Sequence, residues 1–360
     1  MNLGIFLASG DSFKNMAKSG QDVLFKKFYL RYFSKNFSQV YIFSYANEKV
    51  DGLPKNVQVI PNKYNLHRYL YGLLMPFLNL TLVNKCDVIR VYHLFGTIPA
   101  IITKIFFNKN YIFNFAYDYE KVAQIENKKI RGITLKLLKP IAIFFSNKIF
   151  AANKIILAQI PKSKSVYLPN GVDTTFFRQL SKRKTNPRPL ILSVGRLEKQ
   201  KNFESLILAM ADIKSDLLIV GNGSLKSKLV NLAQKNRVNL KIIEKVDNNR
   251  MPQIYNRADI FVLPSLAEGS PKVLLEAMAC GLSVIGAKVV GIKETITNGI
   301  TGLLCDTDSQ SLSKSIVWFL KNPKRADKLA QSARKKILQD YNLYHLLEKE
   351  VLTLKGLVAK

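Results

Sequence analysis

Short apolar runs alternate along this chain with longer segments in which apolar residues recur every three or four positions. The runs have the length and residue types of buried strands, and several of the segments between them have the repeat of amphipathic helices. In the first half the runs lie at residues 2–9, 39–45, 57–60, 87–92, 111–117 and 148–153. In the second half they lie at residues 189–195, 216–221, 239–244, 259–264 and 282–287. Such alternation is typical of a parallel sheet flanked by helices, so we predict an α/β protein with two doubly wound domains.

The two series of runs are separated by a stretch without periodicity. The Pro-Asn-Gly tripeptide at 169–171 predicts a turn, and the basic, proline-containing residues after it fit neither a helix nor a strand. A chain of 360 residues also exceeds the size at which one hydrophobic core keeps growing. We therefore expect an N-terminal domain at residues 1–170 and a C-terminal domain at 171–340, followed by a helical segment at 341–360.

The composition indicates a folded globular chain with an unusual charge. Hydrophobic residues make up 48% and charged residues 22%, which are near globular averages. The net charge of +30 predicts attraction to nucleic acid, anionic lipid head groups or phosphorylated substrates, and it does not choose among them. The excess is spread, since residues 1–170 hold 24 basic and 8 acidic residues, and residues 171–360 hold 31 and 17.

The sequence predicts no disulfide, zinc site or membrane span. Cys86, Cys280 and Cys305 are far apart and form no CxxC pair, which fits a reducing compartment. The N-terminus predicts a first strand, because it lacks the basic start and long apolar run of a secretory leader. The most apolar stretch, residues 69–83, is too short and too interrupted to cross a bilayer. We expect a cytoplasmic protein.

The first candidate for chemistry is the segment from Gly195 to Lys201, which follows a predicted strand and precedes a predicted helix. In open α/β folds, ligands bind at such turns on the carboxyl edge of the sheet. Arg196 can hold a phosphate through two parallel N–H groups, and Lys201 adds a compact positive charge. Together, Arg196 and Lys201 suit a diphosphate. The alternative, in a chain this basic, is that both are solvated surface charges.

The second candidate is residues 268–281, with the sequence EGSPKVLLEAMACG. Pro271 fits the first helical position and Gly281 the position just past the end, so the segment predicts a short helix. The N-terminus of such a helix favours an anion, for example a phosphate. Glu268 precedes the helix and Glu276 lies two turns along it, so the two carboxylates can contact two hydroxyl-bearing parts of one ligand. Two ordinary glutamates near a helix are the alternative.

Four segments together resemble family 4 of the retaining glycosyltransferases. They are PNGVD (169–173), GRLEKQKNFESLILA (195–209), IVGNGSLKSKLV (219–230) and residues 249–304. The resemblance extends from about residue 166 to residue 306. It implies the GT-B fold, in which two Rossmann-like, doubly wound domains face each other across a cleft and C-terminal helices cross back to the first domain.

The resemblance also implies roles for residues of the C-terminal domain. Glu268 and Glu276 correspond to the E-x7-E pair of the family, with Glu268 beside the donor sugar and Glu276 on the nucleoside ribose. Arg196 and Lys201 correspond to the residues that hold the diphosphate, and Gly291 is expected to be structural. The other donor-binding residues expected in this domain are Gly195, Asn222, Gly269, Ser270 and Pro271, with Asn222 near the base.

The first domain resembles the family less closely. The family has a glycine-containing loop after the first strand that closes over the donor phosphate, and Gly10, Ser19 and Gly20 are the candidates here. Many members carry a histidine near the end of a middle strand, close to the sugar. This chain has Asp118 there, which by position takes the sugar-contacting, catalytic role. His93 ends an earlier strand and is either a structural hydrogen-bonding group or a ligand.

The resemblance implies a hexosyltransferase that retains the anomeric configuration and needs no metal or other bound cofactor. Its co-substrate is expected to be a UDP- or GDP-linked sugar, and its acceptor a hydroxyl of a cell-surface glycan or a lipid-linked molecule. Residues 128–148 combine several basic residues with Ile, Leu and Phe. This composition fits an interfacial helix on anionic lipid, at the inner face of the cell membrane, or an ordinary core helix with a basic face.

Two other functions compete with glycosyl transfer. A sugar-nucleotide epimerase can share the two-domain architecture, and it would release a modified sugar nucleotide without any acceptor. A nucleic-acid-binding protein would use the positive charge on phosphate backbones and would bind DNA or RNA in a salt-sensitive way. No nucleic-acid-binding module is recognisable in the sequence, so we expect no nucleic-acid partner.

Overall fold

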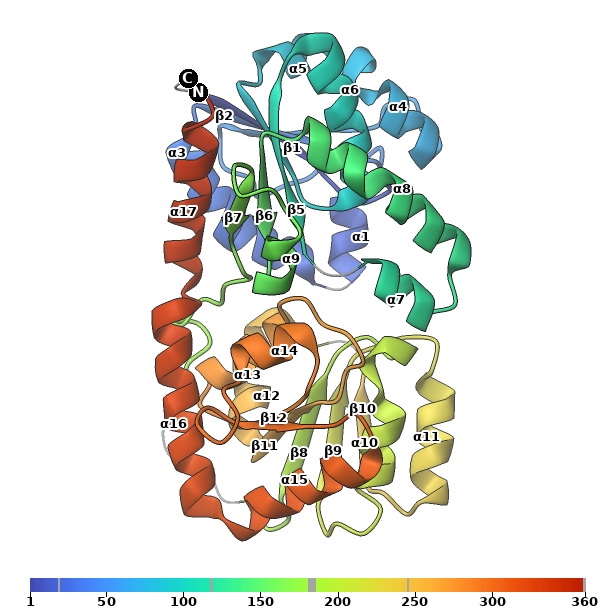
Figure 1. Cartoon of the computed structure of the whole chain (residues 1–360), viewed down its shortest axis with the longest axis vertical. Coiled ribbons are helices and arrows are strands. Elements are labelled where there is room, and N and C mark those ends of the chain that lie inside the picture. Colours follow the sequence, from blue (N-terminus) through green and yellow to red (C-terminus); the bar gives the residue numbers. More distant parts are fainter. Residues whose placement is uncertain (19, 117–118, 181–185, 245, 359–360) are drawn as a thin grey trace. The chain divides into compact units, whose positions relative to one another are not determined.

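The computed structural model of the chain describes residues 1–18, 20–116, 119–180, 186–244 and 246–358. The chain forms two compact units, each built on a parallel sheet (Figure 1). The first unit consists of Met1–Glu120, Lys128–Pro169 and Leu346–Lys360. The second unit consists of Lys121–Asn127 and Asn170–His345.

The sheet of the first unit has the strand order β3-β2-β1-β4-β5-β6-β7. Its strands are β1 (Asn2–Phe6), β2 (Gln39–Phe43), β3 (Val57–Ile60), β4 (Val88–Val91), β5 (Asn110–Phe115), β6 (Lys148–Ala151) and β7 (Ser165–Tyr167). Leu3 of β1 lies beside Val40 of β2 on one side and Val88 of β4 on the other. β4 is buried along its whole length, as expected of a parallel strand with helices on both faces of its sheet.

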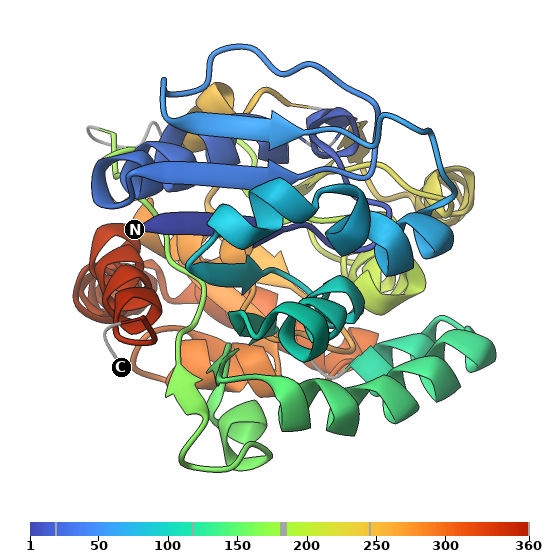
Figure 2. The ribbon, with the colours of Figure 1, turned by 90° about the horizontal axis from the view of Figure 1, so that it is seen from above.

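Helices connect and cover these strands. They are α1 (Phe13–Lys18), α2 (Gln21–Leu24), η1 (Phe25–Leu30), α3 (Arg31–Asn36), α4 (Arg68–Leu78), α5 (Leu80–Lys85), η2 (Leu94–Gly96), α6 (Thr97–Phe107), α8 (Lys129–Phe145), α9 (Lys154–Ala158) and most of α17 (Leu343–Lys355). α4 packs on α6, and α6 packs on α8, so these three helices form one layer on the sheet (Figure 2).

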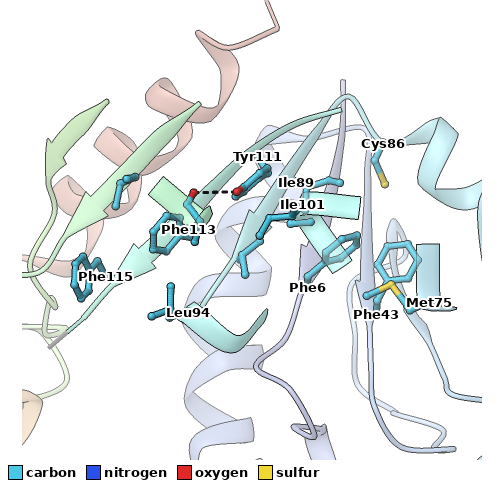
Figure 3. Packing of buried hydrophobic residues seen from close by; sticks show 14 of the residues in the cluster. Phe6, Phe43, Met75, Cys86, Ile89, Leu94, Ile101, Tyr111, Phe113 and Phe115 are labelled. Atoms are coloured by element: carbon cyan, nitrogen blue, oxygen red, sulfur yellow. Dashed lines mark hydrogen bonds between the residues drawn. The ribbon is translucent and has the colours of Figure 1, made fainter. Parts of the chain in front are cut away.

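The hydrophobic core of the first unit lies between its sheet and its helices (Figure 3). The rings of Phe6 and Phe43 meet edge to face with their centroids 5.0 Å apart. Tyr111 of β5 is fully buried, and its hydroxyl donates to the carbonyl oxygen of Ala142 in α8 at 3.0 Å. The core thus fixes α8 to the sheet by both packing and a hydrogen bond.

A buried ion pair holds the C-terminal helix within the first unit. Arg90 of β4 has 1% of its surface exposed, and its guanidinium pairs with the carboxylate of Glu350 in α17. The same guanidinium donates to Asn114 Oδ1 of β5 at 2.6 Å. The far end of the sequence therefore completes a unit that begins with the first residues.

The sheet of the second unit has the strand order β10-β9-β8-β11-β12-β13. Its strands are β8 (Leu190–Val194), β9 (Asp216–Val220), β10 (Leu240–Ile243), β11 (Ile260–Leu263), β12 (Ser283–Ala287) and β13 (Leu303–Cys305). Its helices are η3 (Lys199–Lys201), α10 (Phe203–Ala209), α11 (Lys226–Lys235), η4 (Asn248–Arg250), α12 (Met251–Arg257), α13 (Lys272–Ala279), α14 (Val290–Thr295), α15 (Ser309–Lys321) and α16 (Pro323–Asp340), while α7 (Tyr119–Ile125) falls mostly in this unit. The two parallel sheets with their helices confirm the predicted α/β class.

No helix within the described ranges has both the length and the hydrophobicity needed to cross a membrane. The apolar stretch at residues 69–83 forms α4 and α5, with the break at Asn79.

Candidate functional site

The order of strands in the second sheet reverses between β8 and β11. The chain leaves β8 toward β9 on one side, and it leaves β11 toward β12 on the other side. The loops that follow these two strands therefore diverge at the carboxyl edge of the sheet, which is where ligands bind in open α/β folds. The first predicted motif follows β8 and the second follows β11, so the fold brings both motifs to one place.

Close backbone packing fixes the loop after β8. The N–H of Gly195 donates to the carbonyl of Val220 at 3.0 Å, and the N–H of Leu197 donates to that of Asn222 at 2.9 Å. Gly221 has a φ of +154°, and a Cβ there would lie 1.8 Å from the carbonyl oxygen of Gly195. Position 221 therefore requires glycine, and the first motif is held against the loop after β9.

Hydrogen bonds and a salt bridge join the loop after β8 to the loop after β11. Gln200 Nε2 donates to the carbonyl of Ala267 at 2.7 Å, and the N–H of Leu266 donates to the carbonyl of Gln200 at 2.8 Å. Beside them, Lys201 Nζ donates to Glu268 Oε1 at 2.5 Å. Lys201 and Glu268 are 67 positions apart in the sequence, so the fold brings the two motifs into contact.

Arg196 and Lys201, two of the three cations of the first motif, lie in different environments. Lys201 and Glu268 keep only 14% and 9% of their side-chain surface exposed. Gly195 leaves room for this pair, because a Cβ there would come within 3.2 Å of the Lys201 side chain. Arg196 is exposed, and no carboxylate in the part of the chain that the structure describes pairs with it. Of these two cations, Lys201 is therefore enclosed and paired, and Arg196 is exposed.

The second motif forms the predicted short helix, with a correction at its start. Pro271, expected at the first helical position, precedes α13 as the N-cap, with an extended ψ of 104°. Its carbonyl accepts the N–H of Leu274 at 3.1 Å, as an N-cap carbonyl does, so the helix begins one residue later. Gly281 lies just past the C-terminus with a φ of +72°, as predicted.

The loop before α13 is anchored on two sides. The N–H of Asn170 donates to Ser270 Oγ at 3.0 Å, and the Asn170 amide donates to the Ser270 carbonyl at 2.5 Å. On the other side, the N–H of Gly291 in α14 donates to the carbonyl of Glu268 at 3.2 Å. A Cβ at Gly291 would lie 2.1 Å from the carbonyl oxygen of Gly269. A side chain at position 291 would therefore displace the loop.

Glu276 occupies an enclosed position on α13 and keeps part of its surface open. The hydroxyl of Tyr255, on α12, donates to Glu276 Oε2 at 2.8 Å. Burial raises the pKa of Glu276 to about 7, while the hydrogen bond from Tyr255 and the charge of Lys272 oppose the rise. A carboxyl group with a pKa near neutrality can change its protonation when a hydrogen-bonding ligand arrives.

Asn222 follows β9 at an exposed position, and its side chain forms two hydrogen bonds. Its Nδ2 donates to Glu244 Oε2 at 3.2 Å, and its Oδ1 accepts the N–H of Gly223 at 2.7 Å. A ligand that contacts Asn222 has to share or replace these bonds.

The segment after β1 differs from the single loop expected from the sequence. Helix α1 occupies its middle, because Ser12 Oγ accepts the N–H of Asn15 at 3.1 Å and Glu48 accepts two more N–H groups of the first turn at 3.0 and 2.9 Å. Gly10, with a φ of +81°, stays in the loop after β1. Gly20 lies beyond the helix, at the start of α2. A helix therefore separates the two glycines.

Two expected residues, Ser19 and Asp118, lie outside the described residues. His93, which follows β4, accepts the N–H of Phe95 on its Nδ1 at 3.2 Å and so caps the short helix η2. Its ring also lies against that of Tyr119, with the centroids 4.6 Å apart. These contacts favour the structural interpretation of His93.

Gln200 and Tyr255 both position residues of the predicted site, and neither was predicted from the sequence. Gln200 lies inside the first motif, directly before Lys201, so its place in the sequence was a signal. Tyr255 carried no such signal, since it is a fully buried residue 21 positions before Glu276 on another helix.

Residues 174–336 match the protein family described as Glycosyl transferases group 1. The glycogen synthase of Mycobacterium tuberculosis (strain ATCC 25618 / H37Rv) is 31% identical over 182 residues, which cover 48% of this chain and 44% of the relative. A GDP-mannose-dependent monoacylated alpha-(1-6)-phosphatidylinositol monomannoside mannosyltransferase of Corynebacterium glutamicum is 32% identical over 191 residues, which cover 47% of this chain and 50% of the relative. The chain spans about half the length of the curated relatives that it matches.

Solved structures resemble this chain over nearly all of its length. Sucrose-phosphate synthase from Thermosynechococcus elongatus has a TM-score of 0.87 at 19% identity, with 100% of this chain and 99% of that chain covered. HepE from Anabaena, solved in complex with UDP-glucose, has a TM-score of 0.75 at 18% identity, with 99% and 100% covered. These likenesses confirm the predicted GT-B fold class.

Proposed function

We propose that this protein transfers a hexose from a nucleoside-diphosphate sugar to a hydroxyl group of an acceptor, because residues 174–336 match the family of glycosyl transferases group 1. The observation that carries the proposal is the Lys201–Glu268 pair at the strand-order reversal of the second sheet. The pair sets a cation suited to a phosphate beside a carboxylate suited to a sugar hydroxyl. The UDP-glucose bound to HepE supports a nucleotide-sugar donor.

Lys201 and Arg196 hold the diphosphate in this proposal. An ammonium group has three N–H donors, so Lys201 can bind Glu268 with one and phosphate oxygens with the others. The exposed guanidinium of Arg196 can bind a phosphate through two parallel N–H groups. Residues 269–271 lead into the N-terminus of α13, whose dipole adds positive potential.

The nucleoside contacts the remaining residues of the proposed site. Glu276 accepts hydrogen bonds from the ribose hydroxyls, and Tyr255 holds one of its oxygens in place. Asn222 lies near the base. In the first unit, Gly20 and Asp118 remain our candidates for contacts to the donor phosphate and the sugar.

The proposed transfer retains the anomeric configuration and uses no metal. The acceptor oxygen attacks the anomeric carbon on the face from which the diphosphate leaves. The bond from that carbon to the diphosphate oxygen breaks as the bond to the acceptor oxygen forms, and the departing oxygen takes the acceptor's proton. Lys201, Arg196 and the dipole of α13 stabilise the charge that develops on the diphosphate, while Glu268 orients the sugar. The acceptor is a cell-surface glycan or a lipid-linked molecule.

Thermal unfolding with UDP-, GDP- and ADP-linked sugars, with and without Mg²⁺, tests the donor site, because a ligand that binds only the folded state raises the Tm. We expect one nucleotide to raise the Tm without Mg²⁺, and Lys201→Ala to abolish the shift. Lys228→Ala is the matched control, because Lys228 pairs with Glu204 on the exposed surface of the same unit. No shift with any nucleotide sugar, or equal losses in the two variants, would contradict the proposal.

The transfer step is tested with the donor identified in this way. Glycan and lipid-linked acceptors are incubated with that donor, and NMR reads the anomeric configuration of the product. We expect the configuration of the donor to be kept. An inverted product contradicts the retaining mechanism, and release of a modified sugar nucleotide without an acceptor indicates an epimerase.

A further inference from the structure

Helix α8 is apolar on two opposite sides. Leu135 and Ala142 are buried against the core of the first unit. Five large apolar side chains elsewhere on the helix keep 47–83% of their surface exposed; they are Ile130, Ile133, Leu137, Ile141 and Phe144. Their spacing of three, four, four and three residues follows the helical repeat, so they form one stripe along α8.

Exposed apolar residues continue on the other two helices of the same layer. α4 exposes Leu70, Leu73 and Phe77, and α6 exposes Ile105 and Phe106. The rings of Phe77 and Phe106 lie with their centroids 5.4 Å apart, which joins the two helices at the surface. α6 in turn packs on α8, and Figure 2 shows the three helices together on the first sheet. We call the exposed apolar residues of α4, α6 and α8 the apolar helix face.

The helices of the apolar helix face carry no acidic side chain. Helices α4, α6 and α8 hold six Lys and Arg residues and no Asp or Glu, whereas Asp87, Asp118, Glu120 and Glu126 lie in the segments between them. On α8, Lys129 and Lys136 are exposed, and their separation of seven residues places both along one edge of the stripe. The apolar stripe of α8 therefore has a cationic edge.

We propose that the apolar helix face docks the protein on the surface of an anionic phospholipid bilayer. Exposed apolar patches of this extent mark interaction sites, because their side chains gain free energy when they leave water. Lys129 and Lys136 can lay their apolar stems along the bilayer boundary while their ammonium groups contact anionic head groups.

Charge argues against a second copy of the chain as the occupant of this face. Two copies meeting there would bring together two sets of helices that carry Lys and Arg but no Asp or Glu, and these like charges repel each other. The inference goes beyond the proposed reaction and does not depend on it, because docking requires no donor sugar.

Co-sedimentation of the full chain with phosphatidylcholine vesicles, with and without phosphatidylglycerol, tests the docking surface. We expect binding to the anionic vesicles that weakens as salt rises, and much weaker binding to the neutral vesicles. A variant with Ile133→Ser, Leu137→Ser and Phe144→Ser should bind the anionic vesicles at least about tenfold more weakly than the native chain, because it removes three apolar contacts from the stripe.

The matched control replaces three exposed apolar residues of the second unit. In Leu208→Ser, Ile300→Ser and Leu338→Ser the native side chains are 39–58% exposed, and this variant should bind vesicles as the native chain does. Ile130→Glu is a second test at the most exposed position of the stripe, where a charge does not disturb packing, and it should also weaken binding. Thermal unfolding confirms that each variant is folded.

Absence of native binding to anionic vesicles, equal binding by the native and stripe variants, or an equal loss in the control overturns the inference. If the native chain binds no vesicles, and if the stripe variant has a lower molar mass than the native chain in sedimentation equilibrium, the face is a self-association surface instead. Nucleotide-sugar binding is tested on residues of the second unit, so a failure to bind vesicles leaves the test of the proposed function unaffected.

Discussion

At the scale of single residues, Glu276 lies where its charge is disfavoured. Burial raises the pKa of this carboxyl from 4.5 to about 7 in the folded protein. Between these values the folded state binds more protons than the unfolded chain, so the contribution of Glu276 to stability is full below about pH 4.5 and is lost as the pH rises through about 7. A carboxylate kept at such a position despite this cost is expected of a ligand-binding group.

Glu276→Gln should therefore stabilise the protein at high pH. The amide can still accept the hydrogen bond from Tyr255 and carries no charge, so at pH 8 the free energy of unfolding should rise by up to about 3 kcal/mol. At pH 4.5 and below, the difference should vanish. Urea unfolding at several pH values measures both, and a difference that does not change with pH would contradict the assignment.

Nucleotide affinity should depend on the same titration. In the proposed site, ribose hydroxyls donate to Glu276 and so favour its ionised form. The affinity should therefore rise as the pH increases through about 7, with release of a proton. Tyr255→Phe removes a hydrogen bond that lowers the pKa of Glu276, so the rise should move to higher pH. Calorimetric titration at pH 6, 7 and 8 tests this, and the idea fails if affinity is the same at each pH.

At the scale of elements, the fold class could be predicted because the strands are continuous apolar runs. β11 and β12 are buried at every residue, so their sequences show no alternation and stand out from the helices beside them. The start of α13 was predicted one residue early because the fixed φ of Pro271 suits both the N-cap and the first helical position. Only its ψ separates the two, and the sequence does not encode that angle locally.

The parts that could not be predicted depend on contacts distant in sequence. Helix α1 replaces part of the expected loop because Glu48, 35 positions after Phe13, accepts its backbone N–H. The partnership of Tyr255 with Glu276 likewise exists only after α12 and α13 pack together. For residues 128–148 the sequence left an interfacial and a core helix open, and α8 combines a buried side with an exposed apolar stripe.

Gly291→Ala tests whether α14 must hold the loop before α13 in place. The new Cβ would lie 2.1 Å from the carbonyl oxygen of Gly269, so the loop or the helix has to move. We expect a loss of about 1–3 kcal/mol in the free energy of unfolding and a larger loss of nucleotide-binding free energy. Gly356→Ala, whose Cβ would have no neighbour closer than 3.3 Å, is the control. Native affinity in Gly291→Ala would show that the loop position does not matter.

At the scale of the whole molecule, the first unit is assembled from three separate pieces of sequence. The last piece, Leu346–Lys360, follows the long segment Asn170–His345 that builds most of the second unit. Glu350 within that last piece pairs with Arg90, whose guanidinium is almost fully enclosed. A buried charge depends on its partner, so the C-terminal helix is required for the stability of the first unit.

Glu350→Ala should leave Arg90 buried without its carboxylate and should lower the free energy of unfolding of the first unit by about 3–5 kcal/mol. The double variant Arg90→Met and Glu350→Leu removes both charges and should recover most of that loss. Urea unfolding measures the difference, and nucleotide binding reports whether the second unit is intact. This account would be contradicted if Glu350→Ala left the free energy of unfolding unchanged, or if the double variant were as unstable as the single one.

The same ion pair sets an order of events during synthesis. Glu350 follows Arg90 by 260 positions, so at about 5–20 residues per second it leaves the ribosome roughly 13 to 50 s later. By then every residue of the second unit has already been made, since that unit ends at His345. Until α17 emerges, Arg90 of β4 lacks the carboxylate of Glu350 with which it pairs in the folded protein. The half of the molecule that is synthesised first can therefore complete its core only after the other half has been made.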